Sequence, residues 1–381
     1  MGDVLACLRG WHPALARAEL EALLPQALMK PTQTPRWWRV AHTQKDARAS
    51  ALAVASGLQC FLEDGQLVAI HSTTEDAWFT SALAYIDAHP VEGSVAVRGW
   101  TQNGKLDGWS LSRLSRRVGG ALHERGYTID LQRPDRVLAL IGDGNSQHLA
   151  CGWMEGDGQA AFSNGERRAG ERPFFKPVSL DPMLARLAVN LAAGPVNTGP
   201  VVDPMTGTGG FLLEAALSGR PSLGIDLNSE MAHGAQANLN WACDGPPEHA
   251  RVLRGDATRL TDLLPDGWHG KVAGFVLDPP YGRNSHGSMD SMSLLQACLK
   301  SARSVAAQDA GFVLILPVHP VRPHPETALP LDAEVSLLHG EWKEVRERIE
   351  ATGWTLKSAH VERVHRSLSR LILHARCAPQ G

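Results

Sequence analysis

The sequence has no long apolar segment, no recognisable leader and no paired cysteines. Its longest apolar runs, such as residues 312–318, fall well short of the roughly 20 residues that a helix needs to cross a bilayer. The N-terminus lacks a basic start, a sustained apolar core and a cleavage site, so we expect a cytoplasmic protein. The six cysteines form no CxxC pair and the sixteen histidines show no ligand spacing, which argues against a disulfide framework and a metal site.

The sequence also lacks an excess of one charge. It contains 37 lysine and arginine residues against 40 aspartate and glutamate residues, for a net charge of −3, which alone does not suggest a polyanionic partner. The charge is uneven along the chain, with 7 basic against 10 acidic residues in 1–97, 12 against 9 in 98–176, and 18 against 21 in 177–381. The middle segment is therefore the only basic one.

The length is sufficient for two or three domains. Residues 1–75 alternate short strand-like runs with helical patterns, which predicts a small α+β unit. Residues 76–160 repeat this pattern and include an amphipathic helix near 110–125. Residues 161–176 are rich in glycine, arginine and proline, as is typical of a linker.

Regular strand and helix repeats fill the rest of the chain, residues 177–381. The strand-like runs that precede helical patterns are 200–204, 222–227, 251–254, 272–277 and 311–317. They predict a parallel sheet covered on both faces. Two further runs, 355–364 and 368–375, have no helix between them and predict an antiparallel hairpin that closes the sheet edge.

An acid and a glycine turn follow the first of these strands. Asp203 ends the strand, and Gly207, Thr208 and Gly209 precede a helix. Glycine lets the backbone approach a ligand, and open parallel sheets bind ligands at the carboxyl ends of their strands. A dinucleotide site needs a small residue where Leu212 stands, and the acid would repel a pyrophosphate. The pattern suits S-adenosylmethionine, which carries an ammonium and a sulfonium but no phosphate.

Acids also end the next two strands. Asp226 can accept both ribose hydroxyls of such a cofactor, and Asp256, followed by Ala257, can accept from the adenine amino group. Each acid taken singly is as readily an Asx turn or a helix cap. Three acids at the ends of three successive strands, the first beside a glycine turn, favour a cofactor site.

The fourth strand ends in Asp278, Pro279, Pro280 and Tyr281. A carboxylate and a backbone carbonyl that each accept one amine hydrogen can aim the nitrogen lone pair at a methyl donor. The prolines stiffen the loop, and the tyrosine can stack on a base. These four residues are the catalytic candidates, and a rigid turn after a buried strand is the alternative.

The cations of the middle segment form either a phosphate-binding surface or a solvated face, and composition alone does not decide between them. Those that we single out as candidates for RNA binding are Arg113, Arg116, Arg117, Arg167, Arg168 and Lys176.

These motifs resemble a known family. The segment RPFFKPVSLDPMLARLAVNLA, followed by DPMTGTGGFLLEAA and DPPYG, is similar to the archaeal and eukaryotic tRNA guanine-10 N2-methyltransferases. Residues 127–140 resemble part of a THUMP domain, and residues 361–375 resemble the closing hairpin of these enzymes. The resemblance implies a Rossmann-like methyltransferase domain, with a seven-stranded, mostly parallel sheet and a closing antiparallel hairpin, preceded by ferredoxin-like and THUMP domains.

The resemblance also implies roles for the site residues, with tRNA as the partner. Asp203, Gly207 and Gly209 would border the methionine part of the donor, Asp226 the ribose and Asp256 the adenine, while residues 278–281 would hold the target guanine. Guanine 6 of tRNA, a ribosomal guanine, and a non-catalytic RNA-binding role with a relict fold remain as alternatives. These residues do not decide between one and two methyl additions.

Overall fold

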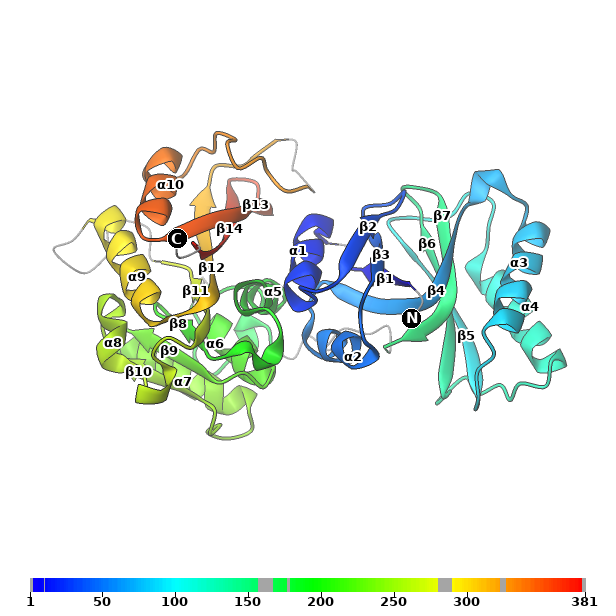
Figure 1. The fold of residues 1–381 in the computed structure, drawn as a ribbon, viewed down its shortest axis with the longest axis horizontal. Coiled ribbons are helices and arrows are strands. Elements are labelled where there is room, and N and C mark those ends of the chain that lie inside the picture. Colours follow the sequence, from blue (N-terminus) through cyan, green and yellow to red (C-terminus); the bar gives the residue numbers. More distant parts are fainter. Residues whose placement is uncertain are drawn as a thin grey trace. The chain divides into compact units, whose positions relative to one another are not determined.

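The structure is a computed structural model that describes residues 3–9, 11–156, 167–176, 179–279, 290–322 and 327–378. The chain divides into two compact units (Figure 1). Unit 1 contains residues 1–13, 26–52 and 58–160, and unit 2 contains residues 14–25, 53–57 and 161–381.

Unit 1 is built on one seven-stranded sheet. Its strands are β1 (Val4–Leu8), β2 (Leu28–Pro31), β3 (Trp37–Ala41), β4 (Leu58–Ala69), β5 (Val95–Gln102), β6 (Arg136–Asp143) and β7 (His148–Glu155). They lie in the order β2-β3-β1-β4-β7-β6-β5, and every pair is antiparallel except β5 with β6. Strands from both sides of residue 75, where the sequence suggests a boundary, belong to the same sheet. Strand β4 pairs with β1 on one side and with β7 on the other.

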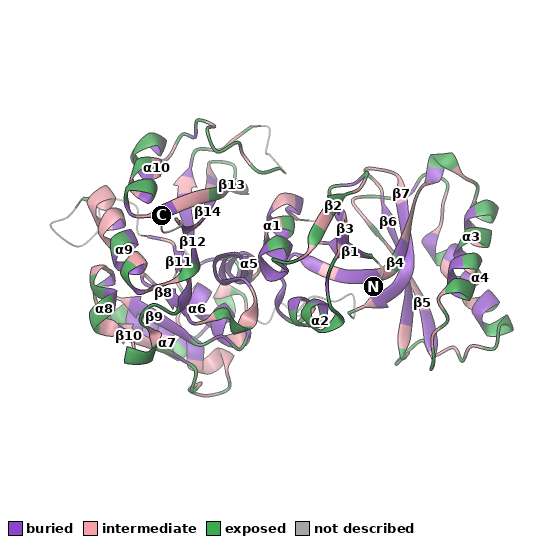
Figure 2. Ribbon diagram, in the orientation of Figure 1, coloured by how far each residue is buried: buried purple, intermediate pink, exposed green. Residues whose placement is uncertain are grey.

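Helices α3 (Glu75–Ala88) and α4 (Leu111–Glu124) pack on one face of this sheet, and α2 (Lys45–Val54) precedes β4. Hydroxyl groups cap the N-termini of α3 and α4: Thr74 accepts from the amide of Ala77, and Ser110 accepts from that of Arg113. The core beneath them contains aromatic side chains, among them Trp153, which is fully buried and donates from its indole nitrogen to the His89 carbonyl at 2.8 Å. Figure 2 shows the buried strands and the exposed outer faces of the two helices.

Unit 2 also contains a seven-stranded sheet, of a different kind. Its strands are β8 (Val201–Asp203), β9 (Ser222–Asp226), β10 (Ala250–Arg254), β11 (Val272–Leu277), β12 (Ala306–Val318), β13 (Trp354–His365) and β14 (Leu368–Cys377). They lie in the order β10-β9-β8-β11-β12-β14-β13. The first five are parallel, and β14 is antiparallel to both β12 and β13. The predicted Rossmann-like sheet with a closing hairpin is confirmed.

Helices cover both faces of this sheet. The helices on one face are α5 (Pro182–Ala193), α6 (Gly210–Leu217) and α7 (Ser229–Ala242), and those on the other are α8 (Leu260–Leu263), α9 (Ser291–Val305) and α10 (Trp342–Ala351). Helix α5 approaches closely because Gly274 faces it: a Cβ there would lie 2.9 Å from Ala193. Short 3-10 helices occur at Ile70–Ser72, Ala169–Glu171, Val196–Thr198, Ala257–Arg259 and Asp266–Trp268. No described helix is long and apolar enough to span a membrane.

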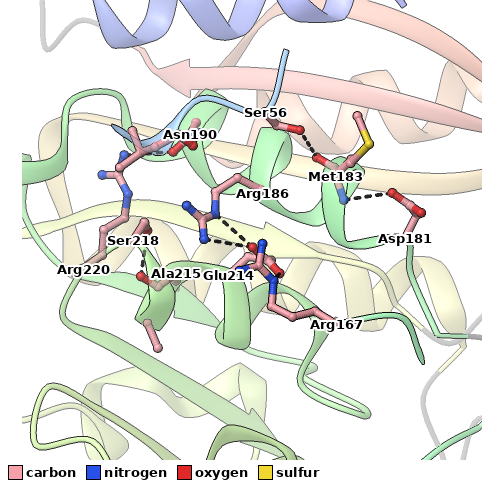
Figure 3. A network of polar contacts seen from close by, with 12 residues as sticks. Ser56, Arg167, Asp181, Met183, Arg186, Asn190, Glu214, Ala215, Ser218 and Arg220 are labelled. Carbon is pink, nitrogen blue, oxygen red and sulfur yellow. Dashed lines mark hydrogen bonds and ion pairs between the residues drawn. The ribbon is translucent and has the colours of Figure 1, made fainter. Parts of the chain in front are cut away.

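Helix α1 (Pro13–Leu23) belongs mostly to unit 2, although the sequence places it in the first α+β unit. The reason is a buried polar network around α5 (Figure 3). Asn190 donates to the carboxylate of Glu19, in α1, at 2.8 Å, and Arg186 donates to Glu214, in α6, at 3.0 Å. Buried charges need such partners, and removing one partner costs about 3–5 kcal/mol. The network therefore fixes α1 against α5.

Candidate active site

The strand order brings the predicted acids to one edge of the sheet in unit 2. Asp203 ends β8, Asp226 ends β9, Asp256 follows β10 and Asp278 follows β11. Strand β8 lies between β9 and β11, so the chain winds outward in both directions from this point. Ligands of open α/β sheets bind at such a switch point, outside the carboxyl ends of the strands. Asp203 and Asp278 stand on its two sides.

One oxygen of Asp203 has no hydrogen-bond donor among the described residues. Asp203 is 1% exposed, and Oδ2 accepts from the hydroxyl of Thr206 at 2.9 Å, whereas the buried Oδ1 accepts no hydrogen bond from the part of the chain that the structure describes. Burial, together with the nearby carboxylates of Asp226 and Asp278, raises the pKa of Asp203 to about 8. An unpaired buried carboxylate is costly. The site therefore fits a ligand that brings a cationic donor, such as the ammonium group of S-adenosylmethionine.

The glycine turn and the second acid hold one another. Gly207 has a φ of 52° and Gly209 a φ of 84°, conformations that favour glycine. The amide of Gly207 donates to Oδ2 of Asp226 at 2.9 Å, and Oδ1 of Asp226 accepts from the amide of Asn228 at 2.9 Å. A carboxylate has about four acceptor positions, so Asp226 keeps acceptor capacity for two hydroxyls.

The turn is also clamped from residues that the sequence reasoning missed. Asn238, fully buried in α7, donates to the carbonyl of Thr208 at 2.9 Å and to that of Phe174 at 2.8 Å, and accepts from the amide of Phe174. Ser179 lies 3.2 Å from the Thr208 hydroxyl. The ring of Phe174 occupies the space over Gly234, where a Cβ would lie 2.1 Å from it. No local signal identifies Asn238, because its partners are distant in sequence.

Asp256 caps a short helix. Its Oδ1 accepts from the amide and the hydroxyl of Thr258, at 2.9 and 2.8 Å, at the start of the 3-10 helix that begins with the buried Ala257. Asp256 therefore acts as a helix cap, one of the two interpretations that the sequence leaves open for it. The side chain is exposed and its second oxygen makes no hydrogen bond within the described residues, so a further donor can still bind there.

Asp278 and Pro279 lie at the end of β11, Asp278 partly buried and Pro279 buried, whereas Pro280 and Tyr281 lie outside the described residues. Burial raises the pKa of Asp278 to about 6, and the positive charge of Arg370, in β14, opposes this rise. Asp278 is thus a carboxylate near neutral pH that can still take up a proton. Within the described part of the chain, no group of histidine, cysteine or acidic residues is arranged to hold a metal ion.

Most of the cations predicted to bind RNA have acidic partners. Arg113 pairs with Glu75 and Arg117 with Asp76, both from α3. Arg167 lies 3.2 Å from the buried Glu214, and Lys176 pairs with Glu230 at 2.7 Å. The two that remain are Arg116, which bonds to the Ser112 carbonyl, and the exposed Arg168. Their part in RNA binding stays a prediction.

The doubly wound sheet, with an acid at each of four strand ends and a glycine turn after the first, defines a Rossmann-type methyltransferase domain. Residues 169–322 match the UPF0020 family model, described as an RMKL-like methyltransferase domain. The chain is 33% identical over 289 residues to the tRNA (guanine(10)-N2)-dimethyltransferase of Methanothermobacter thermautotrophicus, covering 74% of this chain and 73% of that protein. The chain therefore belongs to the family of the tRNA (guanine(10)-N2)-dimethyltransferases.

Two further curated relatives match shorter segments. The Pyrococcus abyssi tRNA (guanine(10)-N2)-dimethyltransferase is 34% identical over 195 residues, 51% of this chain and 55% of that protein, so the match spans about half of its length. The Thermus thermophilus tRNA (guanine(6)-N2)-methyltransferase is 29% identical over 182 residues, 44% of this chain and 46% of that protein. Among solved structures, TrmN from Thermus thermophilus is 21% identical, covers 98% of this chain and 99% of its own, and has a TM-score of 0.49.

Proposed function

We propose that the protein transfers methyl groups to the exocyclic N2 of guanine in tRNA, at position 10, with S-adenosylmethionine as donor. The observation that carries the proposal is the placement of Asp278 and Pro279 beside Asp203 at the switch point of the sheet. The Methanothermobacter and Pyrococcus relatives, both tRNA (guanine(10)-N2)-dimethyltransferases, support the substrate and the position.

The strand-end acids would hold the donor. The unpartnered Oδ1 of Asp203 would accept from its ammonium group, Asp226 from the ribose hydroxyls, and the second oxygen of Asp256 from the adenine amine. Gly207 would border it, because a Cβ there would meet no protein atom within 4 Å. When bound, S-adenosylmethionine supplies an electrophilic methyl group.

Asp278 and Pro279 would orient the acceptor. The guanine amine is a weak nucleophile because its lone pair is delocalised into the ring. The Asp278 carboxylate and the Pro279 carbonyl would each accept one amine hydrogen, which turns the lone pair toward the methyl group. A pKa of about 6 leaves Asp278 ionised at neutral pH and able to receive the proton that the amine loses.

Unit 1, and residues 167–176, which belong to unit 2, would hold the RNA. The family resemblance supports a ferredoxin-like segment in residues 1–75, a THUMP-like segment in 76–160 and a linker in 161–176. Arg113, Arg116, Arg117, Arg167, Arg168 and Lys176 are the cations that this division assigns to tRNA.

The test is transfer of a labelled methyl group from S-adenosylmethionine to an unmodified tRNA transcript, followed by digestion and mass spectrometry. We expect N2-methylated guanosine, mapped to position 10, and loss of product when guanine 10 is replaced. The similarity to the Thermus guanine-6 enzyme favours position 6 as the second candidate, and mapping separates the two. Methylation of another atom, or no transfer to any tRNA, would refute the proposal. Exhaustive reaction distinguishes one methyl addition from two.

A further inference from the structure

The edge of the sheet that carries the site is divided by charge. The acids Asp256, Asp226, Asp203 and Asp278 lie at the ends of β10, β9, β8 and β11, in that spatial order. Beyond β11, five exposed basic residues directly follow β12 or flank the β13–β14 turn, namely His319, Arg322, Arg363, His365 and Arg366, whereas the exposed acids Asp332 and Glu334 lie further along the chain after β12. We call this group of five basic residues the basic edge. A cationic methyl donor would not bind to this basic edge.

The strand register places the β13–β14 turn beyond the carboxyl-end edge of the sheet, with β14 two strands from β11. Leu277, the last residue of β11, is level with Leu314 of β12, and β12 continues to Val318, which pairs with Ser369. Since His365 pairs with Leu368, only two residues, Arg366 and Ser367, form the turn. At about 3.3 Å per residue, the turn rises roughly 13 Å beyond the level of Asp278. Figure 1 shows the hairpin beside β12.

Local contacts hold the turn in place. Glu362 and Arg370 are cross-strand partners just below it, 3.6 Å apart and each about one-fifth exposed. The charge of Arg370 also lowers the pKa of Asp278, so this end of the hairpin lies within electrostatic range of the catalytic candidate. Nδ1 of His365 accepts from the amide and hydroxyl of Ser367, at 3.3 and 3.2 Å, so Nε2 is left as a donor. A two-residue turn fixes the backbone from which these side chains project.

The cations of the turn differ from those of α4 in their partners. Arg366 and Arg322 make no ion pair with any described residue, and both are exposed. Glu362, the acid nearest in sequence to the turn, already pairs with Arg370. Their positive charge is therefore not neutralised by an ion pair with a described residue and can act on an anion at the surface.

We propose that the basic edge binds the phosphate backbone of the RNA next to the target nucleotide, with Arg366 as its central contact. The inference rests on the proposed function, since a guanine held at Asp278 brings its flanking phosphates to the same edge. A phosphate is the anion that exposed arginines bind by paired hydrogen bonds. The turn would thereby fix the entry of the nucleotide while unit 1 holds the rest of the tRNA.

The test is the affinity of the full chain for an unmodified tRNA transcript at several KCl concentrations. One phosphate contact contributes about 0.9 to the salt slope, or about fivefold in Kd at ~0.15 M salt. Arg366→Ala should therefore raise the Kd and the KM for tRNA about fivefold and lower the slope by about one. Arg322→Ala should act in the same direction. Arg366→Lys, which keeps the charge, should restore most of the affinity.

Arg251→Ala is the matched control, because Arg251 is an equally exposed arginine near the opposite end of β10; its tRNA affinity should equal that of the wild type. The Kd for S-adenosylmethionine should stay unchanged in all variants. Unchanged tRNA affinity and slope in Arg366→Ala, with an active wild type, would overturn the inference alone. Parallel loss of donor affinity would overturn it too, since Arg366 would then serve the fold. A wild type that neither binds nor methylates tRNA would end both proposals.

Discussion

The two halves of the sheet edge in unit 2 carry acidic and basic side chains in opposite settings. Asp203 and Asp278 are enclosed, and burial raises the pKa of both carboxyl groups. Arg322 and Arg366 are exposed and make no ion pair with the described residues. A buried charge costs free energy unless a specific partner binds it, whereas an exposed charge attracts a partner at the surface. The enclosed acids suit a small methyl donor that binds inside the site, whereas the exposed arginines suit an RNA that lies across the edge of the sheet.

Asp278→Asn is the change with the largest expected effect. The amide still accepts one hydrogen but presents a neutral group that takes up no proton, so kcat should fall by about 10²–10⁴-fold. The Kd values for donor and tRNA should change little, because neither is proposed to bind mainly through Asp278. Single-turnover methylation and two binding titrations measure this. The exposed Asp309 provides the control variant Asp309→Asn. Equal losses of binding and rate would contradict the division of the sheet edge into an acidic half that serves the reaction and a basic half that binds RNA.

Asp203→Asn tests the acidic half separately. Loss of a charge-assisted hydrogen bond worth about 1.5–3 kcal/mol should weaken donor binding by about 10–100-fold and leave tRNA binding intact. The raised pKa has a second consequence. The folded state holds a proton that the unfolded chain has released, so this group's stabilisation is present at low pH and lost as pH rises through about 8.

The ligand-free Asp203→Asn protein should therefore keep its Tm as pH rises toward about 8, where that of the wild type falls. Calorimetry of both proteins across this range measures the difference. Parallel pH curves would show that Asp203 titrates normally and that its setting is not the costly one described above.

The pH dependence of the rate sharpens the contrast further. Protonated Asp278 donates rather than accepts, so kcat/KM should fall about tenfold per pH unit as pH drops below about 6. The tRNA affinity should not fall over the same interval, because the arginines keep their charge. The Asp278→Asn variant should lose the acid limb. A limb of equal size in that variant would assign the titration to another group.

The two halves also differ in how far the sequence predicts them. The acids follow strand-end motifs, and β11 agrees with its predicted range, because a short buried run bounded by turn residues is a strong local signal. Asp64 and Gly65 resemble a turn in the sequence but form a bulge within the continuous strand β4. The net charge of −3 over residues 177–381 conceals the basic edge.

Contacts between distant residues explain the other omissions. Asn238 reaches Phe174 and Thr208, and Asn190 reaches Glu19 in a helix near the N-terminus. Each is an ordinary polar residue within its own helix pattern. Only the assembled fold reveals that one supports the glycine turn and that the other joins α1 to unit 2.

The smallest expected effect concerns α4, whose cations the sequence makes the first candidates for RNA. Arg113→Ala with Arg117→Ala should weaken tRNA binding only about twofold, less than Arg366→Ala alone, because Glu75 and Asp76 already neutralise these arginines at the surface. Glu75→Gln with Asp76→Asn is the matched counterpart, and should tighten tRNA binding by a similar factor because it frees both guanidinium groups. Salt-dependent titrations of the two double variants decide the order. If the α4 arginines cost more affinity than Arg366, the main contact to the phosphates lies on unit 1, and the turn has at most a secondary part in holding the RNA.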